Sequence, residues 1–139
     1  MQLTKYTDLS LRVMMHLALE PDELGTIKDI AERYRVSRNH LVKVVHQLVN
    51  LGYLKSVQGR GGGITLAKPA AKINVGKVVR QMENTLDVID CAAANCPLTP
   101  SCILKCALNE ATKSFLQVLD NYTVADLVKN RTQLLRLID

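Results

Sequence analysis

The segment TIKDIAERYRVSRNHLVKVVHQLVNLGYLKSVQGRGGGITL (residues 26–66) decides the fold of this chain. Apolar residues recur at helical spacing over residues 26–34 and again over 38–50, and only the tripeptide Arg-Val-Ser separates these stretches. Thr26 and Ser37 are the expected N-terminal caps of the two helices, because their hydroxyl groups can accept a backbone N–H. Two helices joined by so tight a turn predict a helix-turn-helix.

The periodicity changes after Gly52, which is expected to end the second helix. Residues 53–57 and 64–66 alternate with a period of two, as half-buried strands do. Between them, four of the five residues from 59 to 63 are glycine and the other is Arg60. The sequence therefore predicts a β-hairpin with a glycine-rich tip, which is a wing appended to the helix-turn-helix.

The rest of the chain is predicted to be helical. Further helices are expected over residues 8–20, 73–83 and 101–119 and from a capping box at Thr123. The helix over 101–119 carries more apolar surface than one small domain can cover, which predicts a homodimer. The expected fold is mainly α with a small β-hairpin wing. Residues 1–72 would form the winged helix-turn-helix, and residues 73–139 a cysteine loop with a long C-terminal dimerisation helix.

The charge of the chain is positive and unevenly distributed. It has 18 Lys and Arg against 13 Asp and Glu, for a net charge of +5. Residues 28–80 hold most of the excess, which is the electrostatic pattern of a surface that contacts phosphates. No secretory signal opens the chain and no apolar stretch approaches the roughly 20 residues of a membrane span. We therefore expect a cytoplasmic protein without membrane association, in which structural disulfides are rare.

The candidate DNA contacts lie at the start of the second helix and at the wing tip. Arg38 can read guanine and Asn39 can read adenine in the major groove, which the first turn of a recognition helix enters. Arg60, among glycines that permit close approach, suits the minor groove. Alone, each feature would be better explained by solvated side chains or a flexible loop, but their order along the chain predicts binding to double-stranded DNA. The predicted DNA-binding residues are Lys28, Ser37, Arg38, Asn39, His40, Lys43, Arg60 and Gly61.

The cysteines form a second candidate site. Cys91, Cys96, Cys102 and Cys106 have four, five and three residues between them, without the tight two-residue knuckle common in zinc sites. An iron–sulfur cluster offers several irons and so accepts more widely spread thiolates. The alternative is that the cysteines are small buried hydrophobic residues, which is most plausible for Cys106.

These segments together resemble a known family. The opening MQLT, the recognition-helix sequence VSRNHLVK (36–43), the wing sequence GGI (62–64), the first three cysteines and NYTVADLV (121–128) resemble the winged-helix iron–sulfur transcription repressors, and most closely their nitric-oxide-sensitive branch. The resemblance covers essentially the whole chain. It implies a homodimer that binds a roughly palindromic DNA operator, with one cluster per subunit.

The resemblance also implies a ligand set. Cys91, Cys96 and Cys102 would hold a 4Fe–4S cluster, or alternatively a 2Fe–2S cluster, and Asp8 of the partner subunit would be the fourth ligand. By itself, Asp8 is simply an acid favoured by a helix dipole. The chain departs from its relatives twice. Lys105 occupies the place of a ligating histidine in the cluster-assembly branch, and the extra Cys106 is a possible alternative fourth ligand.

The function implied by the resemblance is repression relieved by nitric oxide. Nitrosylation of the cluster would release nitric oxide detoxification genes. One alternative is a sensor of iron or oxidative stress that uses the same cluster. Another is an iron–sulfur electron or cluster carrier, which would not need a recognition helix. We do not expect an enzyme, because the sequence contains no nucleophile–base pair or phosphate-binding loop.

Overall fold

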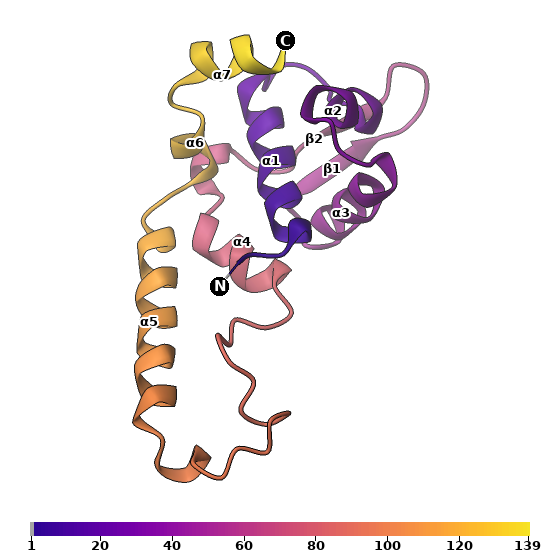
Figure 1. Ribbon diagram of the computed structural model, residues 1–139. Helices are drawn as coiled ribbons and strands as arrows, with labels where there is room; N and C mark the ends of the chain where they lie inside the picture. The colour runs from indigo at the N-terminus through magenta and orange to yellow at the C-terminus, as the bar shows by residue number, and fades with distance from the viewer. Residues whose placement is uncertain (1) are drawn as a thin grey trace.

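The computed structural model describes residues 2–139 and is mainly helical with one small antiparallel sheet (Figure 1). The helices are α1 (Lys5–Leu19), α2 (Ile27–Tyr34), α3 (Arg38–Asn50), α4 (Val75–Met82), α5 (Ile103–Asp120), α6 (Val124–Leu127) and α7 (Arg131–Ile138). The strands are β1 (Leu54–Val57) and β2 (Gly63–Leu66), and short 3-10 turns cover Ala70–Lys72 and Thr99–Ser101. The predicted fold class is confirmed. Within residues 2–139, every helix is too short or too polar to cross a bilayer.

Local chemistry forms the helix-turn-helix. The Thr26 side chain accepts the N–H of Asp29 at 3.1 Å and so caps α2. Arg35 ends α2 in the left-handed region, at φ 52°, which turns the chain sharply toward α3. Ser37 occupies the cap position of α3 as predicted, but its hydroxyl accepts no helix N–H, so its predicted capping bond is wrong.

The wing follows directly from the end of α3. Gly52 lies in the left-handed region, at φ 78°, and donates to the carbonyl of Val49, while Tyr53 donates to that of Leu48. The chain then enters β1, and β1 and β2 pair from Leu54–Leu66 to Val57–Gly63. A backbone bridge between Gly25 and Ile64 ties the hairpin to the start of α2.

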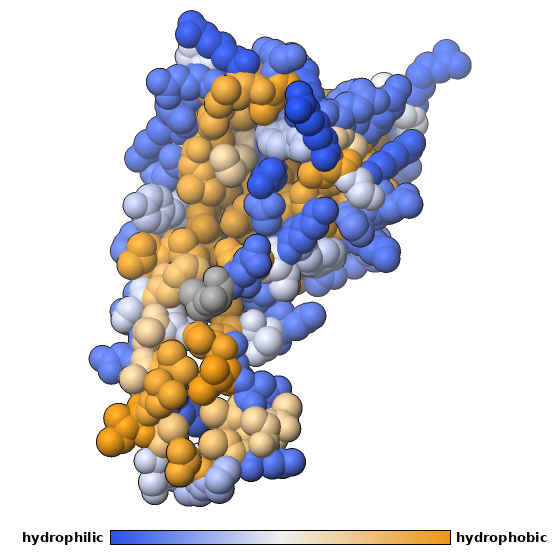
Figure 2. Space-filling model, in the orientation of Figure 1, coloured by the Kyte–Doolittle hydropathy of each residue, from blue (hydrophilic) through white to orange (hydrophobic). Residues whose placement is uncertain are grey.

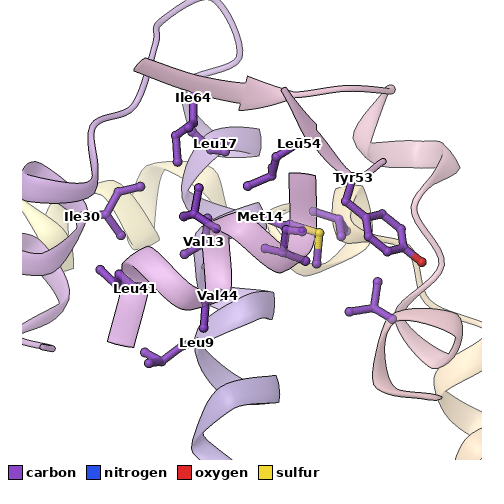
Figure 3. Close-up of a cluster of buried hydrophobic side chains, with 14 of the residues drawn as sticks. Leu9, Val13, Met14, Leu17, Ile30, Leu41, Val44, Tyr53, Leu54 and Ile64 are labelled. Carbon is purple, nitrogen blue, oxygen red and sulfur yellow. The ribbon is translucent and has the colours of Figure 1, made fainter. Parts of the chain in front are cut away.

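One apolar core joins the wing to the helices, and α1 runs through it (Figure 3). The labelled members are Leu9, Val13, Met14 and Leu17 of α1, Ile30 of α2, Leu41 and Val44 of α3, and Tyr53, Leu54 and Ile64 of the wing. Burying a side chain of this size stabilises the fold by roughly 1.5–3 kcal/mol. The orientation of α3 is therefore set by packing on α1.

Two helix predictions need correction. The first helix begins at Lys5 rather than at residue 8, because the side chain of Thr4 accepts the N–H of Thr7 at 3.3 Å and caps it. The helix α7 was not predicted at all. It has no side-chain cap, and Arg131 Nε donates to the carbonyl of Leu19 at 2.7 Å, a contact between distant parts of the chain.

The helix α4 is one of the links between the C-terminal helices and the winged helix-turn-helix. The N–H of Val75 donates to the carbonyl of Tyr122, and the N–H of Val124 donates to that of Ile73. Arg80 makes two hydrogen bonds to the carboxylate of Asp120, at 2.5 and 2.8 Å. From this junction α5 extends away from the winged helix-turn-helix, and the irregular segment between α4 and α5 lies along it (Figure 1).

The buried His16 makes stability depend on pH. Burial lowers the pKa of His16 below its ordinary value of 6.5, although the nearby Glu20 carboxylate acts in the opposite direction. The unfolded chain therefore binds this proton more readily, so the free energy of unfolding falls as the pH drops from about 6.5 through the lowered pKa. The slope from one group is at most about 1.4 kcal/mol per pH unit. Urea unfolding at pH 7.5 and 5.5 should show a smaller loss for His16→Leu than for the parent.

Exposed His46 provides the control. His46→Gln should lose as much stability between these pH values as the parent does. An equal loss in His16→Leu and the parent would show that His16 does not carry the effect.

Candidate nucleic-acid interface and metal centre

The predicted recognition residues lie together on the first half of α3. Arg38, Asn39, His40 and Lys43 are all exposed on this helix, and Ser37 is exposed at its start. We call these five residues the reading surface. Lys28 is exposed in the first turn of α2, the other helix of the motif. The reading surface therefore presents donors to solvent, as contact with base edges and phosphates requires.

The opposite face of α3 holds the reading surface in place. Leu41, Val44 and Leu48 are almost completely buried, at 1%, 0% and 0% exposed. The hydroxyl of Tyr6 in α1 donates to the carbonyl of Lys43 at 3.0 Å. Sequence reasoning missed this bond, because nothing in the local pattern relates residues 37 positions apart. The reading surface is thus positioned both by packing and by a hydrogen bond from α1.

The wing tip places Arg60 and Gly61 in solvent. Gly59 and Gly61 have φ of 96° and 74°, a region that other residues rarely adopt. At Gly62, a Cβ atom would collide with the carbonyl of Val57. Part of the glycine content is therefore required by the turn itself, and the rest leaves the tip open around Arg60.

The cysteines lie in and beside the segment between α4 and α5. We call residues 84–102 the cysteine segment. Cys91, Cys96 and Cys102 are free thiols of intermediate exposure, whereas Cys106 is exposed on α5. The expectation that Cys106 packs inside the protein is therefore wrong. Cys102 is the N-cap of α5, and its Sγ accepts the N–H of Lys105 at 3.4 Å.

The cysteine segment has the donors for a cluster but not a closed site. Within residues 2–139, no three His, Cys, Asp or Glu side chains are arranged to hold a metal ion. The donor set nevertheless fits an iron–sulfur cluster, since three unpaired thiols occur within twelve residues and one already accepts an N–H···S bond, which is typical of cluster-bound sulfur. Binding would have to draw the segment closed, as metal sites coupled to folding do.

The predicted fourth ligand lies elsewhere in the same subunit. Asp8 is in α1, where its carboxylate accepts a hydrogen bond from Arg12 Nε at 2.9 Å and its side chain is 46% exposed. The cysteine segment extends to the far end of the molecule, beyond α4, whereas α1 lies within the winged helix-turn-helix (Figure 1). The structure therefore does not bring Asp8 and the cysteines of one subunit together.

A carboxylate that sequence reasoning missed connects the start of the cysteine segment to α1. Glu83, the last residue before the segment, accepts the N–H of Thr4 at 2.7 Å and its hydroxyl at 2.9 Å. Partial burial would raise the pKa of Glu83, but hydrogen bonds from Thr7 and Thr4 hold it below its ordinary value. The only signal in the sequence is an acid at a helix end, which predicts no particular partner.

The chain matches a known protein family over most of its length. A family model described as Rrf2, iron-dependent transcriptional regulator, matches residues 3–130. The chain belongs to the Rrf2 family. As an Rrf2 protein, it is a DNA-binding transcriptional regulator and not an enzyme.

Individual Rrf2 proteins resemble the chain over nearly its whole length. It is 49% identical to the HTH-type transcriptional regulator NsrR of Bacillus subtilis strain 168, over 99% of this chain and 97% of that protein. The NsrR of Geobacillus kaustophilus is also 49% identical, with the same coverage. Among solved structures, T. potens IscR superposes with a TM-score of 0.76 at 27% identity, covering 94% of this chain and 88% of that one.

Proposed function

We propose that this Rrf2 protein is a homodimeric repressor that senses nitric oxide through a 4Fe–4S cluster held by Cys91, Cys96 and Cys102. The observation that carries the proposal is the set of three free, half-buried thiols on one segment, in a chain 49% identical to proteins named NsrR. When bound, such a cluster supplies reactive iron to which nitric oxide binds. Loss of repression would then release nitric oxide detoxification genes.

The DNA-binding half of the proposal rests on the reading surface and the wing. Residues 1–72 would bind the operator, and residues 73–139 would hold the cluster and the dimer contacts. Arg38 and Asn39 would contact base edges, while Lys28 and Arg60 would contact the DNA backbone or minor groove. Two copies related by a two-fold axis would bind a roughly palindromic operator. Because its target is chromosomal DNA, we place the protein in the cytoplasm.

The dimer would form along α5. Figure 2 shows an apolar band that follows this helix and the end of the cysteine segment. On the outer side of α5, Ile103 is 84% exposed, Leu104 60% and Val118 56%. Ala107 and Ala111 lie on the same side of the helix and are also exposed. A contiguous apolar surface of this kind is unfavourable in water, and a second copy of α5 would cover it.

Asp8 of the partner subunit would supply the fourth cluster ligand. Two features support this assignment over a ligand from the same subunit. The Asp8 carboxylate is half exposed and pairs with Arg12, and within residues 2–139 it forms no group of three potential metal ligands with the cysteines of its own chain. Cys106 is the alternative, since it is exposed one helical turn beyond Cys102.

Spectroscopy tests the proposed function directly. The protein purified without oxygen should show the absorption of a 4Fe–4S cluster, with four iron and four sulfide per subunit. Adding nitric oxide should change the spectrum and abolish operator binding. Two iron and two sulfide would indicate the 2Fe–2S alternative. Release of DNA on iron depletion or oxidation, with no effect of nitric oxide, would favour the iron or oxidative-stress sensor that the family description also suits.

Arg38→Ala should weaken binding to a selected operator by about 1–3 kcal/mol, which is about 5- to 150-fold, because it removes one good base contact. The loss should be concentrated at the base pair that Arg38 reads. Arg60→Ala should weaken binding with less change in sequence preference. Fluorescence anisotropy with the operator and with single-base variants measures both effects.

Arg136→Ala is the matched control for these two variants, since Arg136 is an exposed arginine on α7. It should bind the operator as the parent does. If Arg38→Ala and Arg60→Ala also bound like the parent, α3 and the wing would not be the DNA-reading elements.

A further inference from the structure

A groove runs between the start of α1 and the recognition helix. It has a volume of about 330 Å³ and is lined by Thr4, Lys5, Tyr6 and Leu9 from α1 and by His40 and Lys43 from α3. His40 and Lys43 also belong to the reading surface, so the groove is continuous with it. Lys5 is exposed and was not among the residues predicted to bind DNA.

The charge of the groove is positive. Lys5 and Lys43 contribute two ammonium groups, and no carboxylate lines the groove. Two acidic side chains near the groove, Asp8 and Glu83, have polar partners of their own. Asp8 pairs with Arg12 at 2.9 Å, and Glu83 accepts two hydrogen bonds from Thr4. Glu83 keeps its negative charge but is not part of the lining, so a ligand in the groove would meet the two ammonium groups directly.

The groove is also held in shape. Leu9 is 2% exposed and belongs to the core, and the Tyr6 hydroxyl donates to the backbone carbonyl of Lys43 at 3.0 Å. The packing of Leu9 and the hydrogen bond of Tyr6 therefore fix the spacing between the two walls of the groove, which lie on α1 and α3. Its lining combines the apolar parts of Tyr6 and Leu9 with two ammonium groups, which suits a sugar–phosphate unit better than a bare anion.

We propose that this groove binds a backbone phosphate of the operator, with Lys5 and Lys43 as its cationic contacts. The proposal rests on the proposed DNA-binding function and deepens it. The groove would anchor each subunit beside the bases that α3 reads. It would carry no sequence information itself, because phosphates are the same at every base pair.

The salt dependence of DNA binding tests the proposal. The probe is a duplex selected from random-sequence DNA by the cluster-loaded protein. Each phosphate contact contributes about 0.9 to the slope of log K against log salt, so Lys5→Gln should make the slope of a dimer less negative by about 2. Affinity at 0.1 M salt should fall more than tenfold, with unchanged base preference. Lys5→Arg should restore both the affinity and the slope.

Lys113→Gln is the control, because it removes the same charge from an exposed position in the middle of α5. It should leave the slope unchanged. A second experiment replaces single phosphates of the duplex with neutral methylphosphonates. The effect of Lys5→Gln should vanish at one phosphate in each half-site.

The outcomes separate the two proposals. If the parent protein selects no duplex, both the DNA-binding function and the phosphate site fail. If the parent binds but Lys5→Gln keeps the parent's slope, only the phosphate site fails. An effect of Lys5→Gln that persists at every neutralised phosphate also overturns the site, because Lys5 would then influence DNA binding without contacting one particular phosphate.

Discussion

Replacing Cys91, Cys96 or Cys102 with alanine is expected to abolish cluster binding. Each change removes one of three thiolates, and a carboxylate or solvent cannot replace a thiolate on iron without a large loss of affinity. The variants should still fold, because none of these side chains belongs to the apolar core. Iron and sulfide counts, with absorption spectra recorded without oxygen, measure the loss.

Cys106→Ala is the matched control, since it removes a thiol from the same part of the chain. Its side chain is exposed, so we expect a cost in unfolding free energy of less than about 1 kcal/mol and an unchanged cluster. Loss of the cluster in Cys106→Ala, together with an intact switch in Asp8→Ala, would instead indicate a site with four cysteines.

Asp8→Ala separates cluster binding from signalling. If Asp8 of the partner subunit is a ligand, three thiolates should still retain the cluster, with solvent in the fourth position. DNA affinity should nevertheless fall, because α1 would lose its link to the partner's cluster and α1 contacts the recognition helix through Tyr6. Asp8→Asn tests whether the charge is needed. The same DNA affinity as the parent in both variants would contradict the link.

Placing a carboxylate on the apolar side of α5 is expected to break the dimer. In Ala111→Glu or Val118→Glu, the two-fold axis would bury two unpaired charges at the interface. A buried charge without a partner costs about 3–5 kcal/mol. This cost corresponds to a dissociation constant raised by more than a hundredfold. Sedimentation at micromolar concentration should then detect monomers. Operator binding should also fall, since a monomer contacts only one half-site.

Asn109→Asp is the control for this effect. Asn109 is exposed, and it lies nine residues before Val118, which places it about 180° around the helix from Val118. It should remain dimeric. A monomeric parent with the cluster bound, or dimers in Ala111→Glu and Val118→Glu, would contradict the assignment of this face.

The elements that the sequence predicted correctly are those whose signals are local. The capping bond of Thr26 to Asp29, the glycine at 52 and the period-two strands depend on residues within a few positions of one another. The capping box of Thr123 and Asp126 is present for the same reason. The hydrogen bond from Lys129, together with those from Thr123, lowers the pKa of Asp126 to about 2. Such signals do not depend on contacts with distant parts of the chain.

Three of the missed features depend on contacts between distant residues. The helix α7 is anchored by Arg131 on the carbonyl of Leu19, 112 residues away, and has no capping signal of its own. The bonds from Tyr6 to α3 and from Glu83 to Thr4 likewise join residues that no sequence window contains. A local pattern cannot specify which acid or hydroxyl finds which partner, because packing decides that.

The candidate sites likewise combine features that local sequence predicts with features that only the packed chain shows. The sequence by itself determined where the candidate residues lie along the chain, since Arg38 and Asn39 fall on the first turn of a helix and three cysteines fall on one irregular segment. Tertiary structure alone decided what surrounds them. It leaves Cys106 in solvent, separates Asp8 from the cysteines of its own subunit, and forms a basic groove from α1 and α3. Burial and separation are properties of the packed chain, and no single segment contains them.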